Sequence, residues 1–296
     1  LLVYIILALT FGYTLIMAET SLGRMTRKSP VGAFESFGNS HFISIGGWIN
    51  AIIPILIVPY YSVIGGWVIK YLIEYFAGHS KTLAGDAYFT TFISNGWSTE
   101  ICFIIFTLFT LGIIYAGVRN GIERVSKFMM PILIVLSLII AVYSVTRPGA
   151  IEGVKYFLVP NFDHFSWMTV VSAMGQMFYS LSIAMGILIT FGSYMKKDTS
   201  IEKSTENVEI FDTAIAIMAG LMIIPAVFAF SGGNAETLKS GPALMFITIP
   251  KVFANMGFGT AIGIVFFLLV LFAAVTSSIA LTESAVSTFE DELHWS

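Results

Sequence analysis

The sequence predicts an all-α membrane protein that crosses the bilayer several times. Of its 296 residues, 56% are hydrophobic and only 11% are charged, whereas about a quarter of the residues of a soluble domain are charged. The mean hydropathy is +0.86. Fifteen Lys and Arg and 18 Asp and Glu residues are too few to cover the surface of a folded soluble protein of this size. This composition excludes an ordinary soluble enzyme and a disordered chain.

The charge balance and the cysteine count narrow the function classes further. A formal net charge of −3 argues against a nucleic-acid-binding protein. Cys102 is the single cysteine, so an intrachain disulfide and a metal site built from several thiolates are both excluded. The four histidines are scattered in the sequence and predict no metal site.

Seven apolar segments are long enough to cross a bilayer, since a spanning helix needs about 20 mostly apolar residues. The second segment contains Pro54 and Pro59, which predict a tilted or kinked helix. A short polar hinge is expected at residues 119–124, between the third and fourth segments. The seven segments are expected at residues 1–18, 48–76, 101–117, 128–145, 167–194, 201–230 and 258–289.

The basic residues predict the orientation of these segments. Alternation places the loops that contain Arg24, Arg119 and Lys196 on one side, and these loops are richer in Lys and Arg than the opposite ones. That side is therefore expected to face the cytoplasm. The first apolar run begins at Leu1 with no basic flank before it, so we expect the sequence to be a fragment of a longer protein.

The composition of the fifth segment suits either a broken helix or tight helix packing. Residues 175–186 combine glycines at both ends with small and hydroxyl-bearing residues in the middle. A helix broken at this depth exposes carbonyl groups that can ligate a cation and N–H groups that attract a carboxylate. Tight helix packing through small residues is the other explanation, and the stretch taken by itself favours it.

Two further groups of polar residues lie at membrane depth. Asp212 is about eleven residues into the sixth segment, or roughly 16 Å along a helix, where a carboxylate requires a cation or a proton. The preceding acidic residues, Glu202, Glu206 and Glu209, are expected to form a solvated helix mouth, and Asp212 belongs to that mouth as well if the helix begins later. In the seventh segment, the Ala273 carbonyl, Thr276 and Ser277 can share one helix face and offer three oxygens to Na⁺. Hydroxyl groups that bond their own helix backbone are the alternative there.

Three isolated polar residues complete the list. Tyr61 lies in the middle of the second segment, where its hydroxyl group needs a buried partner or packs against a neighbouring helix. Glu19 and Glu283 lie near the expected cytoplasmic ends of their helices. We expect them to pair with Arg or Lys residues of the loops.

Several stretches of the sequence resemble motifs of the neurotransmitter:sodium symporter family, and of its bacterial amino-acid transporters in particular. The similar stretches are residues 19–24, 119–124, 175–182, 193–198 and 276–293. The resemblance implies an incomplete leucine-transporter-type inverted-repeat fold, all-α, with about seven transmembrane helices. It also implies that residues 1–296 form a single transmembrane transporter domain, equivalent to helices 2 to 8 of twelve, without the first helix and the last four.

The resemblance assigns residues to two sodium sites of the full-length protein. Ala273, Thr276 and Ser277 resemble the second site, and Ser180 and Asp212 resemble ligands of the first. Tyr4, Gln176 and again Ser180 match polar groups around chloride in chloride-dependent members, but Ala216 stands where those members carry Ser. Ionised Asp212 would supply the negative charge, so chloride is expected not to be required.

The resemblance also assigns a substrate pocket and a gate. Tyr61 would donate its hydroxyl group to the substrate carboxylate, and Tyr179 would form an aromatic lid. Met185, where an aromatic residue is common, makes the pocket apolar and deformable. Tyr194 resembles part of the inner gate. The pocket should be lined by Ile57, Tyr61, Tyr179, Ser180, Ser182, Met185, Ser277 and Leu281.

The predicted function is sodium-coupled symport of a hydrophobic or aromatic amino acid into the cell, by alternating access, in a multi-pass protein of the cell membrane. No enzymatic activity and no nucleic-acid partner are expected. A proton-coupled amino-acid permease of the same architecture is one alternative, although Thr276 and Ser277 favour sodium. A seven-helix receptor is another, but the last segment has no retinal lysine. A membrane-bound enzyme is the third, and of its possible catalytic groups only Asp212 is deeply placed.

Overall fold

The computed structural model describes residues 1–38, 40–163, 165–233 and 241–294. The chain divides into two compact units, each assembled from separate parts of the sequence. Unit 1 consists of Leu1–Tyr60, Pro160–Ala214 and Ala280–Ser296, and unit 2 consists of Tyr61–Val159 and Ile215–Ile279. The single transporter domain predicted from the sequence stays a prediction.

Within the described residues, six runs of helix are long and apolar enough to cross a membrane, so the prediction of an all-α multi-pass protein is confirmed. The first span, Leu2–Thr26, joins α1 (Leu2–Leu7), the π-helical turn η1 (Ala8–Gly12) and α2 (Tyr13–Thr26). The others are α4 (His41–Phe76), α7 (Gly96–Tyr115), Asn120–Val145, α12 (Ile201–Ser231) and α14 (Gly259–Leu293). The shorter elements are α3 (Pro30–Glu35), α5 (Ser80–Leu83), α6 (Tyr88–Ser94), α9 (Ala150–Leu158), the π-helical turn η4 (Leu244–Thr248) and α13 (Ile249–Ala254).

The hinge predicted at residues 119–124 is wrong in detail, because these residues are helical. A π-helical turn, η2 (Val118–Ile122), leads directly into α8 (Glu123–Val145). Gly121 makes this turn possible, since a Cβ atom there would lie 2.0 Å from the carbonyl oxygen of Ile113. The helix α4 likewise continues through Pro54 and Pro59 as one element.

Unit 1 is held together by a close approach of α2 to α11 (Ile187–Tyr194). A Cβ atom on Gly23 would lie 1.9 Å from the Ile189 carbonyl oxygen, and one on Gly192 would lie 2.5 Å from that of Thr20. Glycine therefore allows the two backbones to touch, as small residues do at helix interfaces in membranes.

Unit 2 has a core of aromatic side chains. Tyr71 of α4 packs its ring against Phe246 and Phe267, at centroid distances of 5.0 and 5.3 Å. Its hydroxyl group donates a hydrogen bond of 2.8 Å to the Phe246 carbonyl. The α4 helix therefore contacts both η4 and α14 through large rings, each of which is fully buried or nearly so.

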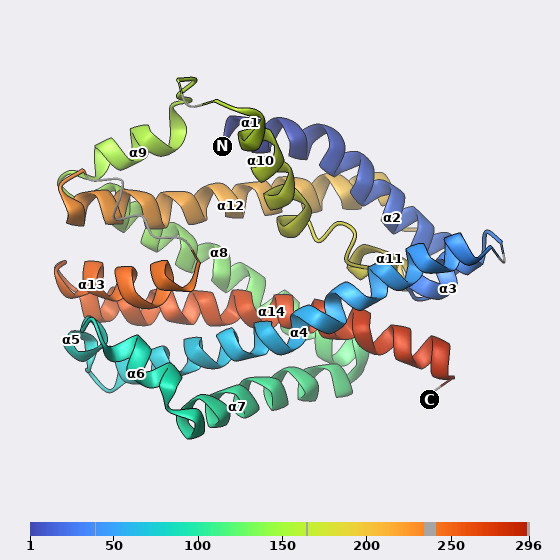
Figure 1. Cartoon of the computed structure of the whole chain (residues 1–296), viewed down its shortest axis with the longest axis horizontal. Helices are drawn as coiled ribbons and strands as arrows, with labels where there is room; N and C mark the ends of the chain where they lie inside the picture. The colour runs from blue at the N-terminus through green and yellow to red at the C-terminus, as the bar shows by residue number, and fades with distance from the viewer. Residues whose placement is uncertain (39, 164, 234–240, 295–296) are drawn as a thin grey trace. The chain divides into compact units, whose positions relative to one another are not determined.

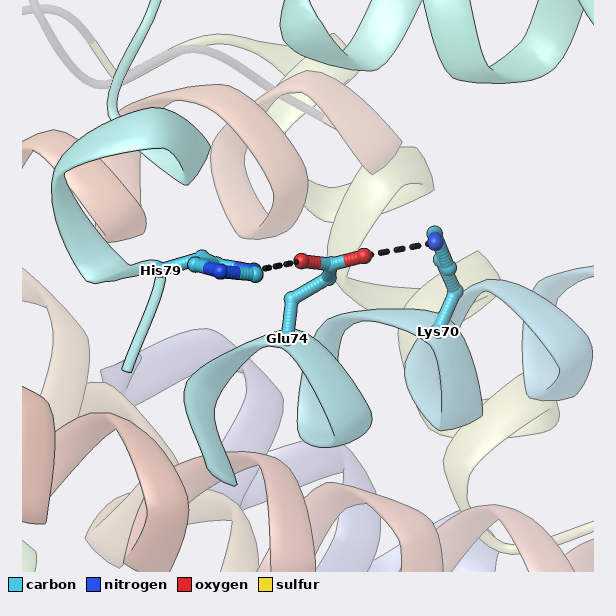
Figure 2. A network of polar contacts seen from close by, with 3 residues as sticks. All are labelled: Lys70, Glu74 and His79. Atoms are coloured by element: carbon cyan, nitrogen blue, oxygen red, sulfur yellow. Dashed lines mark hydrogen bonds and ion pairs between the residues drawn. The ribbon is translucent and has the colours of Figure 1, made fainter. Parts of the chain in front are cut away.

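A polar network stands at the carboxyl end of α4, also in unit 2. Figure 2 shows the Glu74 carboxylate between Lys70 and His79. Its Oε1 lies 2.6 Å from Lys70 Nζ, and its Oε2 lies 2.7 Å from His79 Nδ1. Lys70 is one helical turn before Glu74, and His79 follows the end of the helix, so this network fastens the turn after α4 to the helix itself.

Candidate functional site

The fifth predicted segment is a broken helix, as its composition allowed. It consists of α10 (Trp167–Ser180) and α11, which Figure 1 shows as two helices joined by a non-helical stretch. Within residues 181–186, Ser182, Ala184 and Gly186 have positive φ angles of 57°, 59° and 71°. Ser182 and Ala184 each carry a Cβ atom, so this conformation costs about 1–3 kcal/mol at each of them unless surrounding contacts support it.

One such contact comes from Glu19 of α2. Its Oε1 accepts a hydrogen bond of 2.8 Å from the backbone N–H of Ala184, in the middle of the break. The expected pairing of Glu19 with a basic loop residue is therefore wrong. Local sequence could not reveal this contact, because 165 residues separate the two partners.

The chain of polar contacts beside the break joins α1, α10 and α12. The Ser180 hydroxyl group donates to Asp212 Oδ2 at 2.7 Å, and Tyr4 donates to Ser180 Oγ at 3.3 Å. A carboxylate and hydroxyl oxygens at the end of an interrupted helix are the donor set that an alkali cation uses at such breaks. The two residues assigned to the first sodium site are thus in direct contact within unit 1.

The backbone carbonyl groups at the end of α10 are less free than a simple break suggests. Those of Met177, Phe178 and Tyr179 accept hydrogen bonds from Leu181, Ile183 and Ser182, at 3.0, 3.0 and 3.4 Å. Each carbonyl oxygen retains a second lone pair. The break is therefore stabilised locally while it can still accept another donor or a cation.

The acidic series at the start of α12 is not uniform. Glu202 and Glu206 are exposed, as expected for a helix mouth. Glu209 is only 5% exposed, so the expectation that it is solvated is wrong. Asp212 is half-buried. Burial here depends on the face of α12 and not on distance from its start, because Val208, Ile210 and Phe211 beside Glu209 are exposed.

The second predicted sodium site lies on α14 within unit 2. Thr276 donates its hydroxyl group to the carbonyls of Phe272 and Ala273, both at 3.1 Å, and Ser277 is exposed. The back-bonding alternative therefore describes the geometry of Thr276. The same geometry places the Thr276 and Ala273 oxygens side by side, so the assignment to sodium stays a prediction.

The residues assigned to the substrate pocket are distributed between the two units. In unit 1, Tyr179 is 51% exposed at the end of α10, and Ser182 and Met185 are half-buried in the break. Leu281 is buried and Ile57 is half-buried in the same unit. Tyr61 and Ser277 belong to unit 2. Their role in binding stays a prediction.

The residue assigned to the inner gate has a specific partner. Tyr194, at the end of α11, donates its hydroxyl group to Glu283 Oε1 at 2.7 Å, and Glu283 is 6% exposed. Pairing of Glu283 with a basic loop residue was the wrong expectation. An ionised or polar group that is buried must find a hydrogen-bond partner nearby, and α11 supplies it.

Two arginines at the end of α2 fasten the loop that follows α11. Arg27 donates to the Ser193 carbonyl at 2.7 Å and also to that of Met195. Arg24 donates to the carbonyls of Lys197 and Thr199. The sequence did not predict these contacts between the arginines and the backbone carbonyls, although it did show a basic turn after the first segment.

Fold and site together define a polytopic helical membrane protein that contains one discontinuous helix with polar groups at its break. The model of the sodium:neurotransmitter symporter family matches residues 89–296, and the chain belongs to this family.

Similar proteins agree with this assignment. The chain is 33% identical over 290 residues to the uncharacterized sodium-dependent transporter YhdH of Bacillus subtilis, and 30% identical over 305 residues to an uncharacterized sodium-dependent transporter of Haemophilus influenzae. These matches cover 97% and 99% of the chain. It is also similar to a crystal structure of MhsT in complex with L-phenylalanine, with a TM-score of 0.89 and 35% identity over 100% of this chain and 67% of that one.

The chain spans 63% and 66% of the lengths of the two bacterial relatives. The relatives are named as transporters rather than enzymes, as predicted. Family membership and the apolar spans also confirm a multi-pass membrane protein.

Proposed function

We propose that the intact protein is a sodium-coupled symporter that imports a hydrophobic or aromatic amino acid by alternating access. The observation that carries the proposal is the break between α10 and α11, with the Ser180 hydroxyl group 2.7 Å from the Asp212 carboxylate at its edge. The family and the names of the relatives support coupling to sodium. The L-phenylalanine bound to MhsT supports an aromatic or otherwise apolar substrate.

Sodium would bind to oxygen atoms in each of the two units. In unit 1, Ser180 and Asp212 would contribute a hydroxyl oxygen and a carboxylate. In unit 2, the Ala273 carbonyl, Thr276 and Ser277 would contribute the second set. For this, the Thr276 hydroxyl group would continue to donate its hydrogen to the Phe272 carbonyl, at 3.1 Å, and would offer an oxygen lone pair to the ion.

The substrate would lie against the break. The left-handed residues between α10 and α11 hold the backbone away from helical pairing, which frees polar groups for the amino and carboxylate groups of an amino acid. Tyr179 would cover the substrate, and Ser182 would line the part of the pocket formed by the broken backbone. The flexible thioether of Met185 would adapt to the apolar side chain of the substrate. Tyr61 would donate its hydroxyl group to the carboxylate, and Ile57 and Leu281 would add apolar surface.

Coupling follows from linkage. If the ion and the substrate both stabilise the broken conformation, each raises the affinity for the other by the same factor. The sodium gradient then favours loading from one side of the membrane. Opening on the other side would require the Tyr194–Glu283 hydrogen bond to break, which gives this pair the role of an inner gate.

Chloride would not be required. Tyr4 and Ser180, which match groups around chloride in dependent members, form a hydrogen-bonded chain to the Asp212 carboxylate. That carboxylate can supply the negative charge which chloride supplies elsewhere. Uptake by the intact protein should therefore be unchanged when chloride is replaced by gluconate, and loss of uptake would contradict this part of the proposal.

The main test is the thermal unfolding of the purified intact protein with each of the amino acids, in Na⁺ and then in K⁺. Hydrophobic or aromatic amino acids should raise the midpoint in Na⁺ only. Asp212→Asn should weaken the apparent sodium affinity at least about tenfold, since a charged ligand becomes neutral. Asp198→Asn, in an exposed loop, is the matched control and should change nothing.

Two outcomes would reject the proposal. If amino acids raise the thermal midpoint equally in Na⁺ and in K⁺, substrate binding is not coupled to sodium. If that stabilisation follows pH instead, the proton-coupled permease becomes the better description.

A further inference from the structure

A basic cavity lies in unit 1, at the ends of α2 and α12 and away from the break. Its volume is about 420 Å³. It is lined by Ser21, Arg24, Met25, Arg27, Lys197 and Ile201. Three of these six side chains are cationic, one is a hydroxyl group and two are apolar. The part of the chain that the structure describes contributes no carboxylate to this lining, although Asp198 and Glu202 follow closely in sequence.

The cations of this cavity retain unused hydrogen-bond donors. Arg24 and Arg27 each donate two hydrogen bonds to backbone carbonyls, while a guanidinium group carries five N–H donors. These bonds fix the position of both guanidinium groups without neutralising them, because a carbonyl carries no net charge. The result is a preorganised pair of cations, with the flexible Lys197 ammonium group beside them.

Arg27 is held in place by an uncommon backbone conformation. It has φ 58° and ψ 30°, in the left-handed region, where it ends α2. A side chain with a Cβ atom is strained there, and glycine is the usual residue. Arg27 is exposed to solvent, and its hydrogen bonds to the Ser193 and Met195 carbonyls hold it at the rim of the cavity.

The cavity lies at the level of a membrane surface. The span Leu2–Thr26 ends beside it, and the span Ile201–Ser231 begins at it. The polar headgroups of a bilayer are at this level, and the apolar Met25 and Ile201 side chains face the same cavity as the cations. Phosphate groups suit paired guanidinium groups because the fork of N–H donors matches their oxygens.

We propose that this cavity binds the phosphate group of an anionic phospholipid, with Arg24, Arg27 and Lys197 on the phosphate and Met25 and Ile201 against the start of the acyl chains. The side with more basic residues is expected to be cytoplasmic, where the bilayer surface is negatively charged. Because the arginines also hold the loop after α11, bound lipid would tighten the contact between that loop and α2. The same cations could recognise free phosphate, and the test separates the two sources.

The test uses the intact protein in nanodiscs of phosphatidylcholine with a rising fraction of phosphatidylglycerol, and native mass spectrometry to count retained lipids. The wild-type protein should retain phosphatidylglycerol in preference to phosphatidylcholine. Lys197→Gln should reduce that preference about fivefold, the effect of one lysine near an anionic surface. Lys196→Gln removes the same charge from the adjacent exposed residue, which does not line the cavity, and should leave the preference close to the wild-type value.

A rescue variant keeps the result interpretable. Lys197→Arg retains the charge and should restore the preference, and the thermal midpoint in pure phosphatidylcholine should be the same for all variants. Equal losses in the Lys196→Gln and Lys197→Gln variants would overturn the proposal, because they would indicate only a general attraction to the surface. Displacement of the lipid by millimolar inorganic phosphate, with equal stabilisation of the protein, would assign the cavity to free phosphate instead and also overturn it.

Discussion

Units 1 and 2 are both built from long apolar helices, and both use glycine where two backbones approach closely, but only unit 2 adds a core of aromatic rings among the described residues. In unit 1, α2 and α11 meet through glycine, with the Gly23 and Gly192 positions against facing backbone. Polar pairs such as Tyr194–Glu283 then connect the helices. In unit 2, rings of Tyr71, Phe246 and Phe267 fill the core.

This difference has a physical consequence. Lipid is as apolar as the protein core, so helices in a membrane associate through packing and hydrogen bonds rather than through the hydrophobic effect. Hydrogen bonds can be exchanged for other hydrogen bonds or for bound ions, whereas an interlocked ring cannot be replaced without leaving a cavity. Unit 1, with its hydrogen-bonded pairs, is therefore suited to rearrange around ligands, whereas unit 2, with its core of aromatic rings, is suited to remain fixed.

The largest effect is expected for Gly23→Ala in unit 1. The new Cβ atom would lie 1.9 Å from the Ile189 carbonyl oxygen and 2.7 Å from its carbon, so backbone must move. The cost should exceed about 3 kcal/mol, at the upper end for overpacking, and most of the protein should fail to appear as a monodisperse peak in detergent.

The control for that variant is Gly112→Ala in α7, where no atom lies within 4 Å of the added Cβ atom. This change should be neutral or stabilise by up to about 1 kcal/mol. Similar losses for both variants would mean that the close approach of α2 and α11 is not what Gly23 provides.

The next largest effect is expected for Phe267→Ala in unit 2. Phe267 is fully buried and its ring contacts those of Tyr71 and Tyr75. Its removal should cost about 3 kcal/mol through lost packing, measured as a lower thermal midpoint. Substrate and sodium should still stabilise the variant by the wild-type increment. The exposed Phe76→Ala is the control, and an equal loss there would show that ring burial is unimportant.

A smaller effect is expected for Tyr194→Phe, which removes the donor to Glu283. The buried carboxyl group loses the hydrogen bond from Tyr194, at a cost of about 1–3 kcal/mol. Glu283→Gln and the double variant complete a thermodynamic cycle, and the coupling energy should differ clearly from zero. Tyr115→Phe, at 95% exposure, is the matched control. If the stability changes of the two single variants simply add in the double variant, the Tyr194–Glu283 hydrogen bond does not stabilise unit 1.

The smallest effect is expected for Glu74→Gln in the network of Figure 2. The carboxylate contacts both Lys70 and His79, but their side chains are 26% and 58% exposed, so water screens the interaction. The change in stability should be at most about 1 kcal/mol, and it should diminish in high salt. A larger, salt-independent loss would show that unit 2 depends on polar contacts as much as unit 1.

The sequence by itself determined the fold class and the place of the broken helix. Apolar length fixes the spans, because the bilayer requires about 20 residues per helix. Glycines and hydroxyl residues in 175–186 allowed an interruption, since helix breaks at this depth need groups that tolerate positive φ or supply hydrogen bonds, and the family resemblance favoured it over tight packing. The family motifs then pointed to Ser180 and Asp212, which the structure places in contact.

Only the tertiary structure decided the partners of the remaining polar groups. Glu19 bonds the Ala184 backbone, Glu283 bonds Tyr194, and the arginines of α2 clamp the loop after α11, at separations of 89 to 175 residues. Glu209 is buried although its neighbours Glu202 and Glu206 are exposed. A sequence pattern shows that a buried carboxylate needs a partner, but which group meets it depends on how distant helices pack.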